Sequence, residues 1–289
     1  MRFTLNITML EPDQYIPLAQ AAEAAGFYAA SVSDSIFYPK EVIGEYPYHK
    51  GREFLDGKPF IEPFVAIGAM AASTKTLRFS TYVLKMAIRE PLVLAKSVLS
   101  AAVMSGGRLT MGVGLSPWLD DFTYCQVPWE GRGERMDEMI AILRGLQSGE
   151  YFEFHGNHFD FPLLKMCPAP EKPVPITIGG HTPPALRRAA KLGDGWASAN
   201  LKRAEMKGLI SQLNAFRQEY GTDKRSDYIV QGMLTDIDTF SLDGYREGEE
   251  MGMTDIVLIP WGVYQMKPMT LTERVDAIKR FGDEVISRF

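Results

Sequence analysis

The residues of this chain that could bind a ligand or move a proton are few, and each group follows a short apolar run typical of a strand. Asp34 and Ser35 follow the run 28–33. A carboxylate and a hydroxyl at such a place can hydrogen-bond a ligand or take part in proton transfer. An acidic residue there can equally cap a nearby helix. The local sequence leaves both roles of Asp34 open.

A second group follows the run 174–180, which ends in Gly179 and Gly180 and continues with His181, Thr182 and Pro183. Two glycines let a ligand approach the backbone closely. A helix that begins at Thr182-Pro183 would direct free N–H groups at the same spot, and such an arrangement binds phosphate. The alternative is an ordinary turn in which Thr182 is the N-cap.

A third group, Gly112 and Gly114, lies in the run 108–114. Pro117 stands where a third glycine might complete a dinucleotide-binding fingerprint, so that motif is not favoured. These glycines either admit a flat ring or allow close strand packing. His155 and His158 have no cysteine or carboxylate at convincing ligand spacing, so we expect no metal site. Hydrolase and kinase motifs also lack support.

Strands and helices that alternate along the whole chain would have to position these residues. Apolar runs typical of strands alternate with stretches of helical periodicity, and the strand-like runs are 2–8, 28–33, 77–84, 108–114, 174–180, 195–198, 228–234 and 255–260. This order predicts an α/β fold in which residues 1–289 form a single (β/α)8 barrel domain. The rival is a doubly wound sheet, which usually has glycines after its first strand. Here that strand is followed by Met9-Leu10-Glu11-Pro12, so the barrel is favoured.

Two insertions interrupt the alternation. Residues 36–63 form a loop rich in tyrosine, proline and glycine after the second strand, and residues 151–173 read as a hairpin around Gly156-Asn157. Long loops are commonly functional. The first follows the face on which barrel enzymes keep their sites, so it is either a lid over a substrate or a dimer contact.

Composition limits the partners and the cellular location. The 31 basic and 36 acidic residues give a formal charge of −5, without the basic stripe of a nucleic-acid binder. No apolar stretch is long enough to cross a membrane, and no secretory signal is visible, so we expect a cytoplasmic protein. Cys125 and Cys167 give no disulfide framework.

Several blocks in a fixed order resemble the bacterial-luciferase-like family of flavin and deazaflavin oxidoreductases. The resemblance covers almost the whole chain. Its most specific segments are Ser33-Asp34, 77–84, 105–114, 132–138, 175–180 and Gly193-Asp194-Gly195-Trp196. The loop through Glu45-Tyr46-Pro47-Tyr48 further resembles the subgroup that uses coenzyme F420.

The resemblance implies a luciferase-like barrel with the isoalloxazine or deazaflavin ring in its mouth. By this analogy Tyr82 and Val83 form a bulge with a cis peptide bond that backs the ring. Asp34 and Thr81 line the ring and its tail, with Gly112 and Gly114 nearby. The phosphate would be held by the remaining matched residues: Gly179, Gly180, His181 and Thr182.

The sequence also departs from the family in ways that leave the acid–base chemistry open. Ser35 stands where many F420-using relatives have histidine, Pro117 where the sugar-phosphate dehydrogenases have an acidic glutamate, and Pro39 where they have an aromatic residue. A proton could come from Asp34, from Ser35, from Tyr82 or from a loop tyrosine.

We therefore expect an oxidoreductase that transfers hydride between F420 and a small organic substrate. One alternative is a two-component monooxygenase that uses reduced FMN and oxygen. Another, of a different class, is a non-catalytic flavin-binding or interaction protein on a barrel scaffold. The resemblance also leads us to expect a homodimer and, as a possible partner, a reductase that supplies the reduced cofactor.

Overall fold

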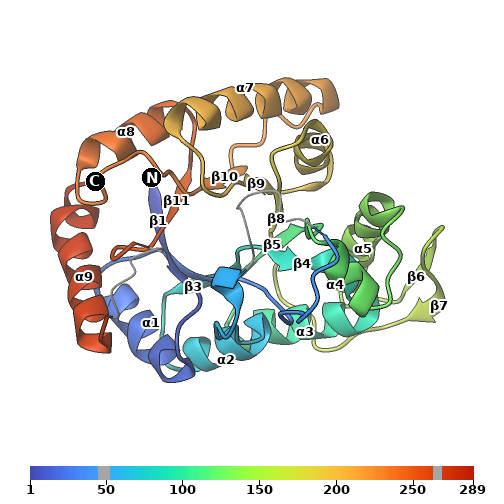
Figure 1. The fold of residues 1–289 in the computed structure, drawn as a ribbon. Helices are drawn as coiled ribbons and strands as arrows, with labels where there is room; N and C mark the ends of the chain where they lie inside the picture. Colours follow the sequence, from blue (N-terminus) through green and yellow to red (C-terminus); the bar gives the residue numbers. More distant parts are fainter. Residues whose placement is uncertain (45–52, 263–268) are drawn as a thin grey trace.

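The computed structural model describes residues 1–44, 53–262 and 269–289, which form a closed barrel of parallel strands surrounded by helices (Figure 1). The strand order is β3-β2-β1-β11-β10-β9-β8-β5-β4, and pairing of β3 with β5 closes the ring. The barrel strands are β1 (Arg2–Ile7), β2 (Ala29–Val32), β3 (Arg78–Thr81), β4 (Leu84–Lys85), β5 (Leu109–Gly114), β8 (Ile176–Gly179), β9 (Gly195–Ala197), β10 (Ile229–Gly232) and β11 (Asp255–Leu258). The predicted barrel and its strand positions are confirmed.

One predicted strand is divided in two. The run 77–84 forms β3 and β4, which are separated by Tyr82 and Val83, and the peptide bond between these two residues is cis. Both strands pair with β5, so together they occupy one position in the barrel. The sequence pattern alone predicted a continuous strand, whereas the family resemblance predicted this bulge.

Helices surround the strands in a ring and cover the apolar outer face of the barrel, whereas the short α4 lies at the C-terminal rim (Figure 1). They are α1 (Tyr15–Ala24), α2 (Pro63–Ala72), α3 (Pro91–Met104), α4 (Leu119–Tyr124), α5 (Arg132–Leu146), α6 (Pro183–Leu192), α7 (Arg203–Tyr220), α8 (Leu242–Glu250) and α9 (Leu271–Glu284). At the start of α9, Thr270 and Glu273 form the predicted capping box, with Glu273 N–H donating to Thr270 Oγ1 over 3.2 Å. The short helix α4 was not predicted.

Alternation along the strands sends apolar side chains outward. In β1, Phe3 and Leu5 belong to the large core beneath the helices, and the Phe3 ring lies 5.5 Å from that of Phe281 in α9. Thr4 and Asn6 lie on the opposite face of the same strand, inside the barrel. The main hydrophobic core is therefore the layer between strands and helices.

The two insertions leave the barrel at different places. Residues 151–173 contain the predicted hairpin of antiparallel strands β6 (Phe152–His155) and β7 (Asp160–Leu164), which projects beyond α5 (Figure 1). Residues 41–44 of the first insertion pack on α4, since Asp120 Oδ1 accepts the N–H of Ile43 over 2.9 Å. The stretch 45–48, which carries the resemblance to F420-using proteins, lies outside the described residues.

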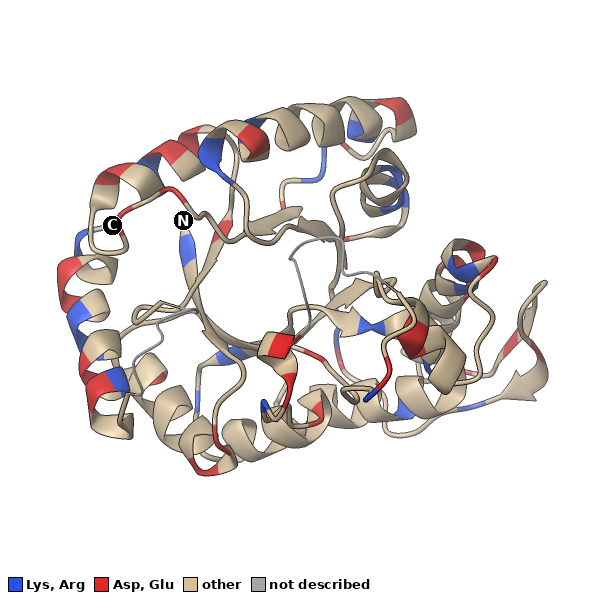
Figure 2. Ribbon diagram, in the orientation of Figure 1, with Lys and Arg blue, Asp and Glu red and all other residues tan. Residues whose placement is uncertain are grey.

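Charged residues are spread over the outer helices, with basic and acidic residues interspersed along α7, α8 and α9 (Figure 2). Among the described residues, no helix has both the length and the apolar character required to span a bilayer.

Candidate active site

The C-terminal ends of the barrel strands form a rim with unusual backbone geometry. Met9 follows β1, Ser116 follows β5 and Asn200 follows β9, and these non-glycine residues have φ angles of 53°, 36° and 54°. Gly180 follows β8 with a φ of 127°. Residues in such sparsely populated conformations cluster at functional sites. This rim is also where barrel enzymes place their active sites.

Val83, which precedes β4, packs against the ends of β5 and β8 at the C-terminal rim. A Cβ atom at Gly114 in β5 would lie 2.9 Å from Val83 Cγ2, and one at Gly179 in β8 would lie 3.2 Å from Val83 Cγ1. The absence of side chains at both positions therefore lets Val83 pack against the two strands. The predicted ring-backing residue and these two predicted glycines form one cluster.

Gly112 has a different reason to lack a side chain. Its ideal Cβ would lie 2.1 Å from the carbonyl oxygen of Thr81, a distance that no real contact allows. The Thr81 hydroxyl donates to the carbonyl of Gly112 over 2.7 Å and accepts its N–H over 3.0 Å. Close strand packing, one of the two alternatives raised by the sequence, accounts for this glycine.

Tyr82 belongs to an interior apolar cluster with Ala197 and Val257. Its hydroxyl donates to the backbone carbonyl of Ser198. Burial raises the pKa of the Tyr82 hydroxyl well above its ordinary value, against a smaller opposing effect from the backbone of Met233. Tyr82 therefore stays protonated near neutral pH, with its hydrogen atom already engaged, and is poorly suited to supply a proton.

The glycine turn after β8 is held in place by Trp196 of the neighbouring strand β9. The indole N–H of the buried Trp196 donates to the carbonyl of Gly180 over 2.7 Å. A side chain at Gly180 would contact Ala185 at 2.7 Å and would require a left-handed backbone. The turn therefore has one conformation, and a glycine is required there.

The helix after this turn differs from the expected anion site in one respect. Thr182 is the N-cap of α6, but its side chain makes no capping hydrogen bond and is exposed. Pro183 and Pro184 occupy the first two helical positions, and neither has an N–H group. An anion at this end would be bound by the Thr182 hydroxyl and by the loop N–H groups, together with that of Ala185.

His181 links this turn to the loop after β9. Its Nε2 accepts the N–H of Ala199 over 3.2 Å, which requires that nitrogen to be unprotonated. Burial lowers the pKa of His181, and the charge of Glu205 opposes that effect. His181 thus acts as a neutral hydrogen-bond acceptor in the structure.

Asp34 is engaged by residues from the other side of the rim. Its buried carboxylate accepts the backbone N–H of Lys85 over 2.9 Å and forms an ion pair with Arg89 at 2.8 Å. Both carboxylate oxygens accept from the Arg89 guanidinium. This arrangement suits a carboxylate that positions β4 rather than one that exchanges protons. Ser35, half-buried, follows it directly.

Sequence reasoning missed a second ion pair at this rim. The Lys85 ammonium group lies 2.7 Å from Asp121 Oδ2 and 4.6 Å from the centre of the Trp118 ring. Ser116 also donates to Asp121, which is fully buried. The signal was the acidic pair Asp120-Asp121 in the segment after β5, where it lies in the first turn of α4 and both residues are fully buried.

An open hollow lies beside this network, between the first insertion and α4. Phe37, Tyr38, Pro39 and Tyr124 contribute to its lining. The Phe37 and Tyr124 rings meet edge-on with centres 5.8 Å apart, and the Tyr124 hydroxyl donates to the carbonyl of Glu41 over 3.2 Å. An aromatic, partly polar surface therefore borders the rim.

The predicted residues thus come from adjoining parts of one rim. Thr81 and Val83 contact β5 and β8 at their glycines, and the 179–182 turn begins at the end of β8. Tyr82 packs with Ala197 of β9, and Asp34 contacts the strand that follows Val83. The pocket between the N-terminal strand ends, by contrast, is lined by none of these residues.

Comparison with known proteins identifies the family of the chain. The family model described as luciferase-like monooxygenase matches residues 6–235. The chain belongs to this family. An uncharacterized protein of Mycobacterium tuberculosis is 43% identical over 292 residues and covers 100% of both chains.

Other proteins that are similar to this chain have stated activities. An F420-dependent glucose-6-phosphate dehydrogenase of Tsukamurella paurometabola is 31% identical over 189 residues, which cover 64% of this chain and 52% of that relative. The coenzyme F420-dependent tetrahydromethanopterin reductase from Methanopyrus kandleri shares the fold with a TM-score of 0.77 at 15% identity, covering 100% of this chain and 99% of that one.

Proposed function

We propose that this protein is an oxidoreductase that transfers hydride between coenzyme F420 and a small organic substrate. The observation that carries the proposal is the cluster of Val83, Gly114 and Gly179, which joins the bulge between β3 and β4 to the 179–182 turn. The F420-dependent relative supports the choice of cofactor.

The residues of the rim fit such a cofactor in two ways. Glycines leave the ends of β5 and β8 free of side chains beyond Val83, which suits a flat ring. The exposed Thr182 hydroxyl makes no capping bond and can donate to a phosphate. The paired prolines remove two N–H donors, so this hydroxyl and the loop N–H groups assume more of the phosphate binding.

When bound, the cofactor would supply the hydride chemistry, and the chain would supply position and a dry environment. Val83 would back the ring, and Tyr82 would close the barrel interior below it. The Asp34–Arg89 pair would hold β4 and thereby the bulge. Accurate positioning of a reactive carbon is worth several kcal/mol of a reaction barrier, on the order of 7–11 at best.

Ser35 is our candidate for contact with the substrate, because Asp34 and Tyr82 already have strong partners. We expect Ser35→Ala to lower turnover while cofactor affinity stays within about twofold of wild type, since the ring site is formed by other residues. A matching loss of cofactor affinity would instead place Ser35 on the cofactor.

Titration with each cofactor tests the proposal directly. Purified protein would be titrated separately with oxidised F420, FMN and reduced FMN, the last without oxygen, and binding followed by absorbance or fluorescence. We expect F420 to bind at least about tenfold more tightly than FMN, a difference of about 1.4 kcal/mol. Preference for reduced FMN would favour the monooxygenase alternative, and binding of neither cofactor would favour a non-catalytic barrel.

Thr182→Glu tests the phosphate end of the site. An added carboxylate would repel the anionic tail, so we expect F420 affinity to fall more than about tenfold. Ser211→Glu, which adds the same charge to an exposed position of α7, is the matched control and should bind normally. Substitution of Gly180 is avoided because any side chain there strains the turn. Equal affinity in both variants would contradict the proposed phosphate site.

We extend the proposal to a homodimer that acts in the cytoplasm, and a separate reductase remains a possible source of reduced cofactor. Size-exclusion chromatography with light scattering would measure the assembly state of the protein.

A further inference from the structure

Part of the barrel interior is lined by small polar side chains rather than by the bulky aliphatic residues that usually fill a barrel. Strand alternation directs five buried polar residues inward, each at most 4% exposed: Thr4, Asn6, Ser31, Ser80 and Thr177. Their outward neighbours, such as Leu5 and Phe79, belong to the main core. This part of the interior is thus a polar zone enclosed by an apolar layer.

The polar atoms of these residues are not satisfied by the described part of the chain. Thr4 Oγ1, Asn6 Oδ1, Ser31 Oγ, Ser80 Oγ and Thr177 Oγ1 are buried and have no hydrogen-bond partner there. Buried polar atoms nearly always have a partner, in the protein or in ordered water. A buried polar group without a hydrogen-bond partner lowers the free energy of unfolding by about 1–3 kcal/mol. Several such groups together would equal much of the stability of a domain.

Three of these residues lie side by side on adjacent strands, whereas Thr177 lies in β8 and pairs with Gly112. Asn6 in β1 pairs with Ser31 in β2, and Ser31 pairs with Ser80 in β3. Ser80 in turn pairs with Thr110 in β5. Neighbouring strands are about 4.8 Å apart, a spacing that one water molecule can bridge between two hydroxyl groups.

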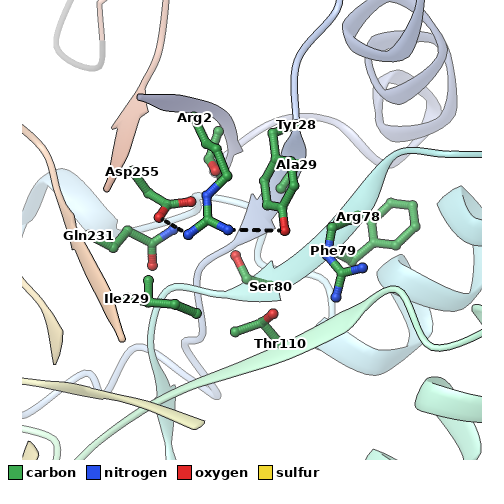
Figure 3. Close-up of a pocket in the computed structure, with 11 residues that line it drawn as sticks. Arg2, Tyr28, Ala29, Arg78, Phe79, Ser80, Thr110, Ile229, Gln231 and Asp255 are labelled. Carbon is green, nitrogen blue, oxygen red and sulfur yellow. Dashed lines mark hydrogen bonds and ion pairs between the residues drawn. The ribbon is translucent and has the colours of Figure 1, made fainter. Parts of the chain in front are cut away.

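A pocket at the N-terminal face reaches this polar zone (Figure 3). Arg2 spans its mouth, donating to Asp255 over 2.6 Å and to the Tyr28 hydroxyl over 3.4 Å. Thr4 and Ser80, both with unpartnered hydroxyl groups, line the same pocket. Its volume of about 20 Å³ admits a water molecule. Solvent at this face is therefore next to the interior polar atoms.

The opposite end of the zone approaches the rim along β1. Alternation places Thr8 after Asn6 on the inner side, and its hydroxyl oxygen is also buried without a partner in the described chain. Tyr82, Ala197 and Val257 form an apolar cluster inside the barrel. The polar route therefore runs along β1, β2 and β3 beside this apolar cluster, and it ends beneath the C-terminal rim.

We propose that the barrel interior binds a chain of ordered water molecules, which carries water and protons between the Arg2–Asp255 mouth and the underside of the C-terminal rim. This route does not depend on which cofactor the rim binds, so it can be tested on the cofactor-free protein. It would give the rim contact with solvent protons even when its outer side is covered.

A crystal structure of the cofactor-free protein at a resolution that shows waters is the first test. We expect ordered waters within hydrogen-bond distance of Thr4, Ser31 and Ser80. An interior without waters, or side chains that pair with one another, overturns the proposal.

The sign of a stability change is the second test. Thr177→Val and Ser80→Ala remove hydroxyl groups and add no bulk. In a hydrated interior each variant loses a hydrogen bond to water, and we expect the Tm to fall by about 2–4 °C. In a dry interior the same changes remove an unmet polar group, and the Tm would rise. Thr272→Val, at an exposed position of α9, is the control.

Exchange of the Asn6 side-chain amide with D₂O, followed by NMR, tests the route itself. We expect Ala29→Leu, which places bulk in the pocket, to slow this exchange about tenfold or more, because exchange then requires a larger opening of the barrel. Ala24→Leu, the same change at an exposed position of α1, should leave the exchange unchanged. If Ala29→Leu is unstable, Ser80→Val supplies the same obstruction. Exchange that is equally fast in the obstructed and control proteins overturns the route.

Discussion

At the N-terminal rim of the barrel, charged side chains secure the chain as it enters the strands, whereas at the C-terminal rim the backbone itself takes unusual conformations. Glu23 accepts the N–H groups of Lys75, Thr76 and Leu77 before β3. Arg108 donates to the carbonyls of Ser105, Leu77 and Ala71 around the start of β5. The opposite rim instead has non-glycine residues with positive φ, namely Met9, Ser116 and Asn200, and the cis peptide bond between Tyr82 and Val83.

From this difference we expect the N-terminal rim to stabilise the fold and the C-terminal rim to bind ligands. Hydrogen bonds from one side chain to several backbone groups fix loops that need not change. Glycines and exposed caps leave space and unused donors. A barrel can therefore vary its C-terminal loops while the other end keeps the strands together.

Gly112→Ala has the largest expected effect, and it challenges this division between the rims because it lowers stability from the C-terminal half of β5. The new Cβ would overlap the Thr81 carbonyl oxygen, so the backbone has to move. We expect the free energy of unfolding to fall by about 3 kcal/mol or more, measured by urea denaturation. Gly208→Ala in α7, where nothing lies within 4 Å, is the control and should raise stability by about 0.5–1 kcal/mol. A mild effect at Gly112 would mean that the junction of β3 and β5 adapts easily.

Arg108→Met tests the N-terminal rim by removing all the side-chain donors while keeping much of the apolar stem. We expect a loss of about 2–4 kcal/mol in unfolding free energy, because several buried carbonyls lose their partner. Cofactor affinity, measured by titration at a temperature where the variant is folded, should change less than about twofold. A large loss of affinity would show that the two rims are coupled.

Glu23 gives the N-terminal rim a pH dependence. Burial would raise the pKa of Glu23, but the N–H groups of residues 75–77 prevail and lower it from 4.5 to about 2. Because the folded pKa is the lower one, its stabilising effect is full above pH 4.5 and is lost as the pH falls toward 2. We expect about 1 kcal/mol after allowing for solvent screening. Urea denaturation of wild type and Glu23→Gln over this range should converge at low pH, and parallel curves would contradict this explanation.

The smallest expected effect concerns the pKa values of two histidines, one at each of two different places in the structure. Burial lowers the pKa of His181 at the C-terminal rim. A hydrogen bond to Asp160 raises the pKa of the exposed His155 in the hairpin. NMR titration should therefore place them on opposite sides of the ordinary value of 6.5. For His181 the neutral folded form is favoured, so its Ala199 contact weakens as the pH falls, and His181→Gln should remove that dependence.

Much of the fold was predictable because strand and helix periodicities are local properties of the chain. The capping box at Thr270 and the helix start at Pro183 follow from rules that involve a few adjacent residues. The division of 77–84 into β3 and β4 was not visible in the apolar pattern, because the reason for it lies in other strands. Gly114 and Gly179 accommodate Val83 across the barrel.

The site was predictable where one short segment forms it and unpredictable where partners are distant. The 179–182 turn could be located from its residues, although the effect of Pro184 on anion binding was overlooked. The roles of Lys85 and Arg89 depend on Asp121 and Asp34, and nothing in their own surroundings along the chain reveals these ion pairs. Whether these residues bind the cofactor stays a prediction.

The contact of Val83 with Gly114 and Gly179 couples the substitutions that these three positions, distant along the chain, can accept. A methyl group acquired at position 114 or 179 meets Val83, so such a change is tolerated best after residue 83 has become smaller. The order of substitutions then matters. Among descendants of this chain, side chains at 114 or 179 should accompany alanine or glycine at 83.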